Sequence, residues 1–329
     1  MFKLIFLLLI TPFLVSCNST NSGNGRSDIP GKIVFSAQDE SGTIQIFTMN
    51  ADGSNIRQLT DDERSSRSPA WSPDGSQIAF ATARDAPVSF TTLWVMEADG
   101  SNQHPLVNNP RSGQPQFGDN PAWSPDGARL AFDDCIDCEA FGRNHEIFVA
   151  DLLTGTIDTL AQHPAADGGA VWSPDGTRLL FSSDRSCPDM LFCSDLYAIS
   201  VDGTDLKRIT FSEPPVAIAS ANWLSPDSIS YIRNEVEIID ASTGSSLKDL
   251  IVLNLKEDRQ HPVLTDLQVN AFWIFWEPVR HRFLSIEKES DEVPVTLTMF
   301  DLDGNTIEEI ILTNPLLKTA KGFKWKITQ

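Results

Sequence analysis

Apolar residues along this chain fall into short runs that are separated by turn-forming residues and recur in a fixed order. Residues 78–80, 130–132 and 179–181 are such runs, and each follows a Ser-Pro-Asp-Gly turn. A further apolar run, a tight turn containing Gly and a closing run complete each unit. Short runs bounded by Gly, Pro and Asp are typical of β-strands. The pattern therefore predicts an all-β protein.

A tryptophan just before the turn marks each repeat. Pro-Ala-Trp-Ser-Pro-Asp-Gly at residues 69–75 recurs at 121–127 and, with Ala-Val at its start, at 170–176, while weaker copies follow later. The six tryptophans lie 52, 49, 51, 53 and 49 residues apart. The repeat residues are Trp71, Asp74, Gly75, Trp123, Asp126, Gly127, Trp172, Asp175, Gly176, Trp223, Trp276 and Trp325.

These residue types have structural reasons to recur. Pro fixes φ at the first turn position, Asp accepts from backbone N–H groups just ahead, and Gly adopts a positive φ without a steric clash. Trp is large enough to fill the wedge between neighbouring sheets. We therefore interpret the repeated aspartates as structural residues of the turns.

Four short strands in about 50 residues, repeated, indicate the blades of a β-propeller. The pattern opens at residues 32–35 with a second strand and ends at 322–326 with a first strand. We expect the C-terminal strand to pair with the N-terminal three and close the ring, which removes the exposed sheet edges. The prediction is a six-bladed propeller over residues 31–329. In the fifth unit, Thr243 and Gly244 are expected to form the turn between strands three and four, and residues 247–269 an insertion.

The repeats resemble those of TolB-type β-propellers. The resemblance rests on Trp-Ser-Pro-Asp-Gly, on Ile-Ala-Phe at residues 78–80, and on Asp-Gly-Ser-Asn with a trailing Leu-Thr at 52–60. It covers residues 31–230 and fades beyond them. It implies a WD40-like propeller, but the separate N-terminal domain of TolB has no expected counterpart here, so a role in the Tol system is not implied.

The N-terminal residues resemble an export signal followed by a lipid attachment site. Lys3 precedes a continuous apolar stretch at residues 4–10, and Leu-Val-Ser-Cys at 14–17 resembles the lipobox of bacterial lipoproteins. This implies a signal peptide at residues 1–16, lipidation of Cys17 and a flexible tether at 17–30. The alternative is an ordinary cleaved signal. We expect a protein of the bacterial cell envelope that is lipid-anchored to a membrane and faces the periplasm or the exterior.

The composition of the chain limits the classes of partner that it is expected to bind. Asp and Glu outnumber Lys and Arg by 45 to 25, which gives a formal net charge of -20. Such a chain is repelled by phosphate backbones and anionic headgroups, so nucleic-acid binding is excluded. We expect a monomer that binds a protein or peptide of the cell envelope.

Four cysteines remain besides Cys17. We predict two disulfides, Cys135–Cys138 and Cys187–Cys193, which would hold two long loops of neighbouring blades. A pairing across the blades and a zinc site are the alternatives, but disulfides are more typical of exported chains.

The order of strands places the long loops at residues 82–92, 108–120, 133–144, 161–169 and 182–194 on one face. Binding residues concentrate on loops held by a rigid scaffold. The candidate partner-binding residues are Arg84, Phe90, Arg111, Phe117, Arg143 and Arg185. The alternatives are that these are ordinary surface arginines and loop phenylalanines, or that Phe90 and Phe117 pack under their own loops.

No catalytic constellation stands out. The chain has five His without a ligand-like spacing, no Gly-x-Ser-x-Gly sequence and no nucleotide-binding motif. We expect no cofactor, no metal and a non-catalytic binding protein. The alternative is a hydrolase or lyase acting on peptides or sugars at the channel mouth, for which two nearby carboxylates of raised pKa would be the sign.

Overall fold

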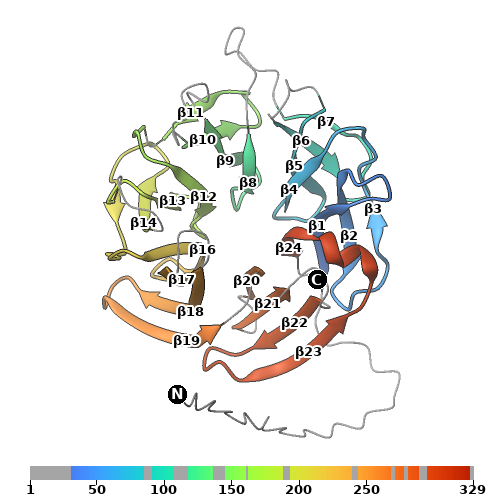
Figure 1. Ribbon diagram of the computed structural model, residues 1–329. Helices are drawn as coiled ribbons and strands as arrows, with labels where there is room; N and C mark the ends of the chain where they lie inside the picture. Colours follow the sequence, from blue (N-terminus) through green and yellow to red (C-terminus); the bar gives the residue numbers. More distant parts are fainter. Residues whose placement is uncertain are drawn as a thin grey trace, which may run out of the picture.

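The computed structural model describes residues 31–84, 91–106, 118–135, 145–160, 162–187, 193–238, 244–267, 271–277, 281–288 and 295–326. In these residues the strands form six four-stranded antiparallel sheets, which stand around a common axis as the blades of a propeller (Figure 1). The predicted six-bladed fold is confirmed. The signal, Cys17 and the tether lie outside the described residues.

The first four blades share one plan with a short outer strand. The first contains β24 (Lys321–Lys326), β1 (Lys32–Gln38), β2 (Ile44–Asn50) and β3 (Arg57–Gln58). The second contains β4 (Ser66–Trp71), β5 (Gln77–Thr82), β6 (Thr92–Glu97) and β7 (His104–Pro105). The third contains β8 (Asp119–Trp123), β9 (Arg129–Cys135), β10 (His145–Asp151) and β11 (Ile157–Thr159).

The remaining blades complete the ring. The fourth contains β12 (Asp167–Trp172), β13 (Arg178–Ser183), β14 (Asp195–Ser200) and β15 (Lys207–Arg208). The fifth contains β16 (Val216–Ser225), β17 (Ser228–Ile238), β18 (Gly244–Asn254) and β19 (Arg259–Leu267). The sixth contains β20 (Ala271–Glu277), β21 (Arg282–Lys288), β22 (Val295–Phe300) and β23 (Thr306–Leu312), and η1 (Pro315–Thr319) leads into β24.

The ring closes as predicted, by pairing of β24 with β1. Ile33 lies opposite Trp325 in this antiparallel ladder. The fully buried ring of Phe323 stacks on Phe35 with 5.3 Å between the ring centroids. Closure thus joins the two ends of the propeller through both backbone pairing and an aromatic core.

The tryptophans of the repeat pack between blades. The indole Nε1 of Trp172 donates to the carbonyl of Ala122 in the preceding blade at 2.9 Å, and Trp123 donates to Ala70 at 3.2 Å. Trp172 belongs to a core that includes residues of β9 and β10. Each of these tryptophans therefore fills the wedge and also fixes the distance to its neighbour.

Two arginines strengthen these junctions. The guanidinium of Arg129 lies over the ring of Trp172 at 4.8 Å and donates to the carbonyl of Gly176 at 3.1 Å. Arg178 lies over Trp223 in the next junction at the same distance. Stacking on a tryptophan is favourable for a guanidinium, so each arginine links one blade to the turn of the following blade.

The repeated aspartates are structural. Asp74 accepts from the Ser72 hydroxyl at 2.6 Å and from the Ser76 backbone N–H at 3.0 Å. Gly75 has a φ of 74°, which favours glycine. The hydrogen bond from Ser72 is the largest cause that lowers the pKa of Asp74 to about 2. Asp126 and Asp175 hold the equivalent turns in the same way.

The fifth blade corrects the prediction for Thr243 and Gly244. Gly244 begins the third strand, β18, and pairs with Ile238, so it does not form the turn between strands three and four. Residues 247–269 are not an insertion, because most of them belong to β18 and β19. The actual turn uses Asn254, whose side chain caps two backbone N–H groups, and Asp258 with a φ of 50°. Without Gly, this turn gave no recognisable signal in the sequence.

No helix in the described part of the chain has the length and apolar character needed to cross a bilayer.

Candidate functional site

The face of the ring that carries the longer connections is here called the loop face. It holds the connections between second and third strands and those between blades, whereas the opposite face holds the tight Asp-Gly turns. The inner strands β4, β8, β12 and β24 surround the axis and begin at the loop face (Figure 1). The beginnings of these four strands are called the mouth below.

A repeated break in the inner strands shapes the mouth. Ser68, Asn120, Gly169 and Ser220 each lie three residues before a repeat tryptophan and have φ values of 51°, 49°, 65° and 50°. The register of each inner strand shifts at this point. A bulge bends a strand and re-aims side chains, so the starts of these four inner strands depart from the regular sheet.

One side of the mouth is acidic. Asp133, on β9, accepts from the Asn120 side chain at 2.8 Å and from the backbone N–H of Gly169 at 3.2 Å. It thereby joins the inner strands of the third and fourth blades. Burial raises the pKa of Asp133 to about 7, and the neighbouring charges of Asp119 and Asp167 act in the same direction.

Asp167 and the predicted partner-binding residue Arg185 form an internal pair beside Asp133. The Asp167 side chain is fully buried, and the Arg185 guanidinium binds its carboxylate. Arg185 also lies over the rings of Tyr197 at 4.9 Å and Phe181 at 5.5 Å. Burial raises the pKa of Asp167 in spite of this pairing. Arg185 thus lies at the predicted face, but its guanidinium is engaged within the blade.

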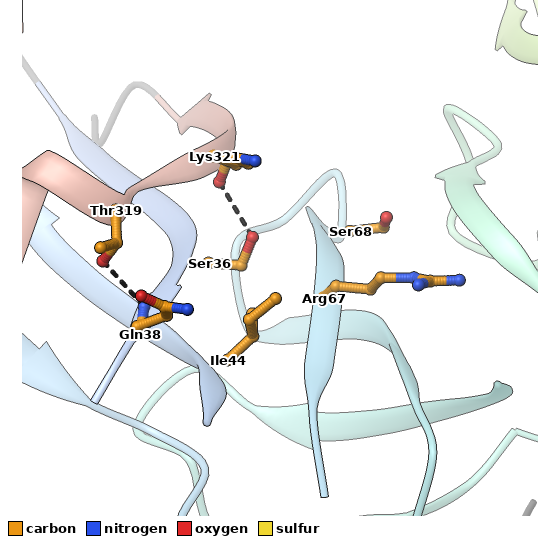
Figure 2. A pocket seen from close by; sticks show the side chains of 7 residues that line it. All are labelled: Ser36, Gln38, Ile44, Arg67, Ser68, Thr319 and Lys321. Carbon is orange, nitrogen blue, oxygen red and sulfur yellow. Dashed lines mark hydrogen bonds between the residues drawn. The ribbon is translucent and has the colours of Figure 1, made fainter. Parts of the chain in front are cut away.

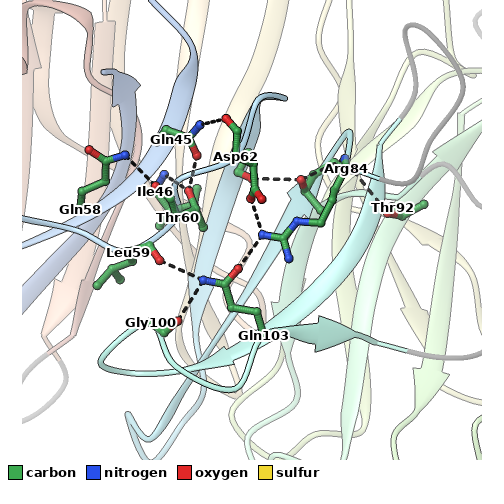
Figure 3. A network of polar contacts seen from close by, with 12 residues as sticks. Gln45, Ile46, Gln58, Leu59, Thr60, Asp62, Arg84, Thr92, Gly100 and Gln103 are labelled. Carbon is green, nitrogen blue, oxygen red and sulfur yellow. Dashed lines mark hydrogen bonds and ion pairs between the residues drawn. The ribbon is translucent and has the colours of Figure 1, made fainter. Parts of the chain in front are cut away.

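The predicted residue Arg84 is also engaged within the propeller (Figure 3). Its guanidinium binds the carboxylate of Asp62 and donates to Gln103 at 2.6 Å, while it lies over the Trp94 ring at 4.3 Å. Gln45 continues the network by donating to the Asp62 carbonyl at 2.6 Å. This network connects the first and second blades, so the structure assigns Arg84 a packing role.

The other predicted contact residues, Phe90, Arg111, Phe117 and Arg143, lie outside the described residues, as does Cys138. The side chain of Cys135 is not described either. Cys187 and Cys193 form the disulfide that the sequence predicted. This bond lies on the loop face, in the connection between β13 and β14.

The adjoining side of the mouth is basic and contains a pocket of about 360 Å³ (Figure 2). The pocket lies between the closing blade and β4. Its described lining residues are Ser36, Gln38, Ile44, Arg67, Ser68, Thr319 and Lys321. A volume of this size is within the range of small-ligand sites. None of these lining residues is acidic, in a chain with a net charge of -20.

Two hydrogen bonds fix the walls of the pocket. The Ser36 hydroxyl donates to the carbonyl of Lys321 at 3.0 Å, and the Gln38 N–H donates to the Thr319 hydroxyl at 2.9 Å (Figure 2). These residues are more than 280 positions apart in the sequence. The pocket therefore exists only because the ring closes.

Arg67 links the basic and acidic sides. One of its terminal nitrogens lies 3.0 Å from the carboxylate of Asp119, and both side chains are partly exposed. An exposed pair of this kind is weak. Lys324, also on β24, has an accessible side chain, yet the surrounding protein desolvates its ammonium and lowers its pKa, while Asp133 acts in the opposite direction. A side chain that is accessible and yet surrounded by protein is expected where Lys324 faces the ring axis.

Sequence reasoning did not select Arg67, Lys321 or Lys324. The sequence feature that could have indicated them is the group of lysines at residues 321–326, on the closing strand of an otherwise acidic chain. Among the residues that the structure describes, no group of three or more His, Cys, Asp or Glu side chains is placed to hold a metal ion.

Comparison with known proteins relates the chain to a family of propellers. Residues 111–254 match the family model of the TolB beta propeller domain. A dipeptidyl-peptidase 5 of Porphyromonas endodontalis is 29% identical over 140 residues, which are 42% of this chain and 19% of that protein. An uncharacterised protein of Agrobacterium fabrum is 30% identical over 120 residues, or 33% of this chain and 40% of the other. The chain thus matches less than half the length of either relative.

Solved structures show the same fold. TolB from Acinetobacter baumannii aligns with a TM-score of 0.65 at 18% identity, over 90% of this chain and 66% of that one. An oligogalacturonate lyase in complex with manganese aligns with a TM-score of 0.57 at 13% identity, over 84% and 73% of the two chains. Both binding proteins and enzymes thus occur on this fold. Residues 111–254 thus match a TolB-type β-propeller domain, and the solved structures show that the chain as a whole has the propeller fold.

Proposed function

We propose that this protein is a non-catalytic, membrane-anchored, extracytoplasmic propeller that binds a protein or an extended peptide at its loop face. The observation that carries the proposal is the mouth, where a basic pocket at Arg67 and Lys321 adjoins an acidic side at Asp119, Asp133 and Asp167. Opposite charges across a rigid surface fix the direction in which a partner binds.

The rigidity of the mouth supports a binding role. Asp133 joins two inner strands, and the hydrogen bonds of Ser36 and Thr319 hold the closing blade. A preformed surface loses little conformational entropy when a partner binds. The resemblance of residues 14–17 to a lipobox supports the anchor, which would keep the propeller at a membrane of the cell envelope.

The proposal is tested by crosslinking the full-length protein in its native membrane and identifying its partners by mass spectrometry. We expect a recurrent envelope protein that is lost with Lys321→Glu and retained with Lys207→Glu, a matched change on an exposed lysine of β15. In the same preparations, Cys17→Ser should release the protein from membranes. Capture of the same partners by both lysine variants would contradict binding at the mouth.

An enzyme remains the second candidate because of one observation. The pKa of Asp133 is raised to about 7, and its charge interacts with that of Asp167, as in catalytic carboxylate pairs. However, Asp133 is only 6% exposed and the Asp167 side chain is fully buried, so neither offers a free carboxylate to a substrate. Turnover of peptides or oligosaccharides that Asp133→Asn abolishes would favour this candidate.

A further inference from the structure

The pocket beside β24 differs in charge from the rest of the protein. It holds the cations Arg67 and Lys321, and its described lining contains no carboxylate. The net charge of -20 repels anions over the surface as a whole, so an anionic group would bind only where local cations outweigh that field. The pocket is such a place.

The donors of the pocket remain available to a ligand. Among the residues that the structure describes, no carboxylate pairs with Lys321. Arg67 uses one terminal nitrogen for Asp119 at 3.0 Å, and a guanidinium has further N–H groups in a planar fork. Figure 2 shows the Arg67 guanidinium directed away from Lys321, so a charge-assisted hydrogen bond from the Lys321 ammonium would hold a carboxylate and the charge of Arg67 would attract it from farther away.

The rest of the lining suits the end of a peptide chain. Ile44 and the aliphatic part of Arg67 provide apolar surface, while Ser68 provides a hydroxyl (Figure 2). A volume of about 360 Å³ accommodates a terminal residue with an apolar side chain, and a free phosphate or a metal complex would use none of the apolar surface. The walls are fixed by the hydrogen bonds of Ser36 and Thr319, so the site is formed before a ligand arrives.

The position of the pocket gives the bound chain a direction. A carboxylate held by Lys321 leaves the preceding residues to run across the mouth toward Asp119, which pairs with Arg67 from the next blade and is partly exposed. Asp133 and Asp167 are buried and would not contact these residues. Basic side chains a few residues before the terminus would be favoured by Asp119 and by the net charge of -20.

We infer that the pocket formed by ring closure recognises the free C-terminal carboxylate of a peptide or protein partner, with an apolar last residue and basic residues upstream. This inference rests on the proposed function, since it specifies which part of a partner enters the mouth. A free small carboxylic acid shares the same chemistry, and the experiment below separates the two sources.

The test uses two pools of random pentapeptides that differ only at the C-terminus, one with free carboxylates and one with amides. Peptides retained by the full-length protein are identified by mass spectrometry, and the dissociation constants of those retained are measured in both forms. We expect the free acids to bind about tenfold more tightly than the amides, because the charge-assisted hydrogen bonds are lost in the amides. Apolar last residues should be enriched.

Variants connect this preference to the pocket. Lys321→Met should reduce the preference to less than about twofold, whereas Lys207→Met should leave it unchanged. The backbone carbonyl of Lys321 still accepts from Ser36 in the first variant, so the closing strand keeps this bond. Unchanged circular dichroism and melting temperature would show that both variants are folded.

The outcomes separate the inference from the proposed function. Equal binding of acids and amides would overturn the inference and leave peptide binding intact, whereas retention of neither pool would overturn both. N-acetyl-leucine is a small carboxylic acid without upstream residues. If it displaces a bound peptide at the same concentration as the best peptide does, the pocket recognises small carboxylates, and the inference that it recognises the end of a peptide is overturned. A preference that persists in Lys321→Met would place the carboxylate elsewhere.

Discussion

Two aspartates show how strongly the surroundings decide the behaviour of one side chain in this propeller. The Asp74 carboxylate is held by the Ser72 hydroxyl in an exposed turn, which lowers its pKa to about 2. The Asp133 carboxylate lies inside the mouth, where burial raises its pKa to about 7. Their effects on stability therefore depend on pH with opposite signs.

The pKa of Asp133 predicts a loss of stability with rising pH. The folded-state pKa of Asp133 exceeds the ordinary value of 3.8. Its contribution to the free energy of unfolding is therefore complete below about pH 4 and is lost as the pH rises toward 7. Asp133→Asn should flatten this part of the curve of unfolding free energy against pH, measured by urea denaturation between pH 4 and 8.

Asp74→Asn is the matched control. The contribution of the Asp74 carboxylate to the free energy of unfolding is present above about pH 4 and is lost only as the pH falls toward 2. The variant should leave the slope between pH 5 and 8 unchanged. The same slope in wild type and Asp133→Asn would show that burial of Asp133 does not govern this pH range.

At the scale of the element, the closing strand β24 is the most consequential. It joins the ends of the chain, and it carries Lys321 and Lys324 to the mouth. Its core residue Phe323 is fully buried against Phe35. Stability of the ring and composition of the pocket therefore depend on the same six residues.

Phe323→Ala should lower the free energy of unfolding by about 3–5 kcal/mol, because it removes a buried aromatic ring and leaves a cavity. Urea denaturation followed by tryptophan fluorescence measures the change. Leu153→Ala, at a side chain that is 93% exposed, should change it by less than about 0.5 kcal/mol. A loss for Phe323→Ala of under about 1 kcal/mol would mean that the closing contact contributes little to the fold.

The elements also show what the sequence could reveal. The Trp71 and Asp74 motif recurs at a constant period, so blades, turns and closure were predictable from local patterns. The turn at Asn254 and Asp258 lacks Gly and escaped notice. The pocket could not be predicted, because Ser36 and Lys321 meet only through closure across 285 positions. Arg84 and Arg185 were selected by residue type and expected face, and only the structure shows that their guanidinium groups bind Asp62 and Asp167.

At the scale of the whole molecule, the net charge of -20 and the basic pocket act on a partner over different distances. The field of many acidic side chains reaches a partner before contact and is screened beyond about 8 Å at physiological salt. Contacts in the proposed pocket would act only once a partner is bound and would be less screened. The net field should therefore govern association rates, and the pocket should govern dissociation rates.

This division predicts opposite salt effects for two peptides that share a free C-terminus and an apolar last residue. The association rate of a peptide with upstream lysines should fall as salt is raised from about 0.02 to 0.3 M, and that of a peptide with upstream glutamates should rise, because salt weakens attraction and repulsion alike. The two rates should converge near the upper concentration, as measured by stopped-flow fluorescence. Rates that change in the same direction would mean that the charge of the whole ring does not steer partners to the mouth.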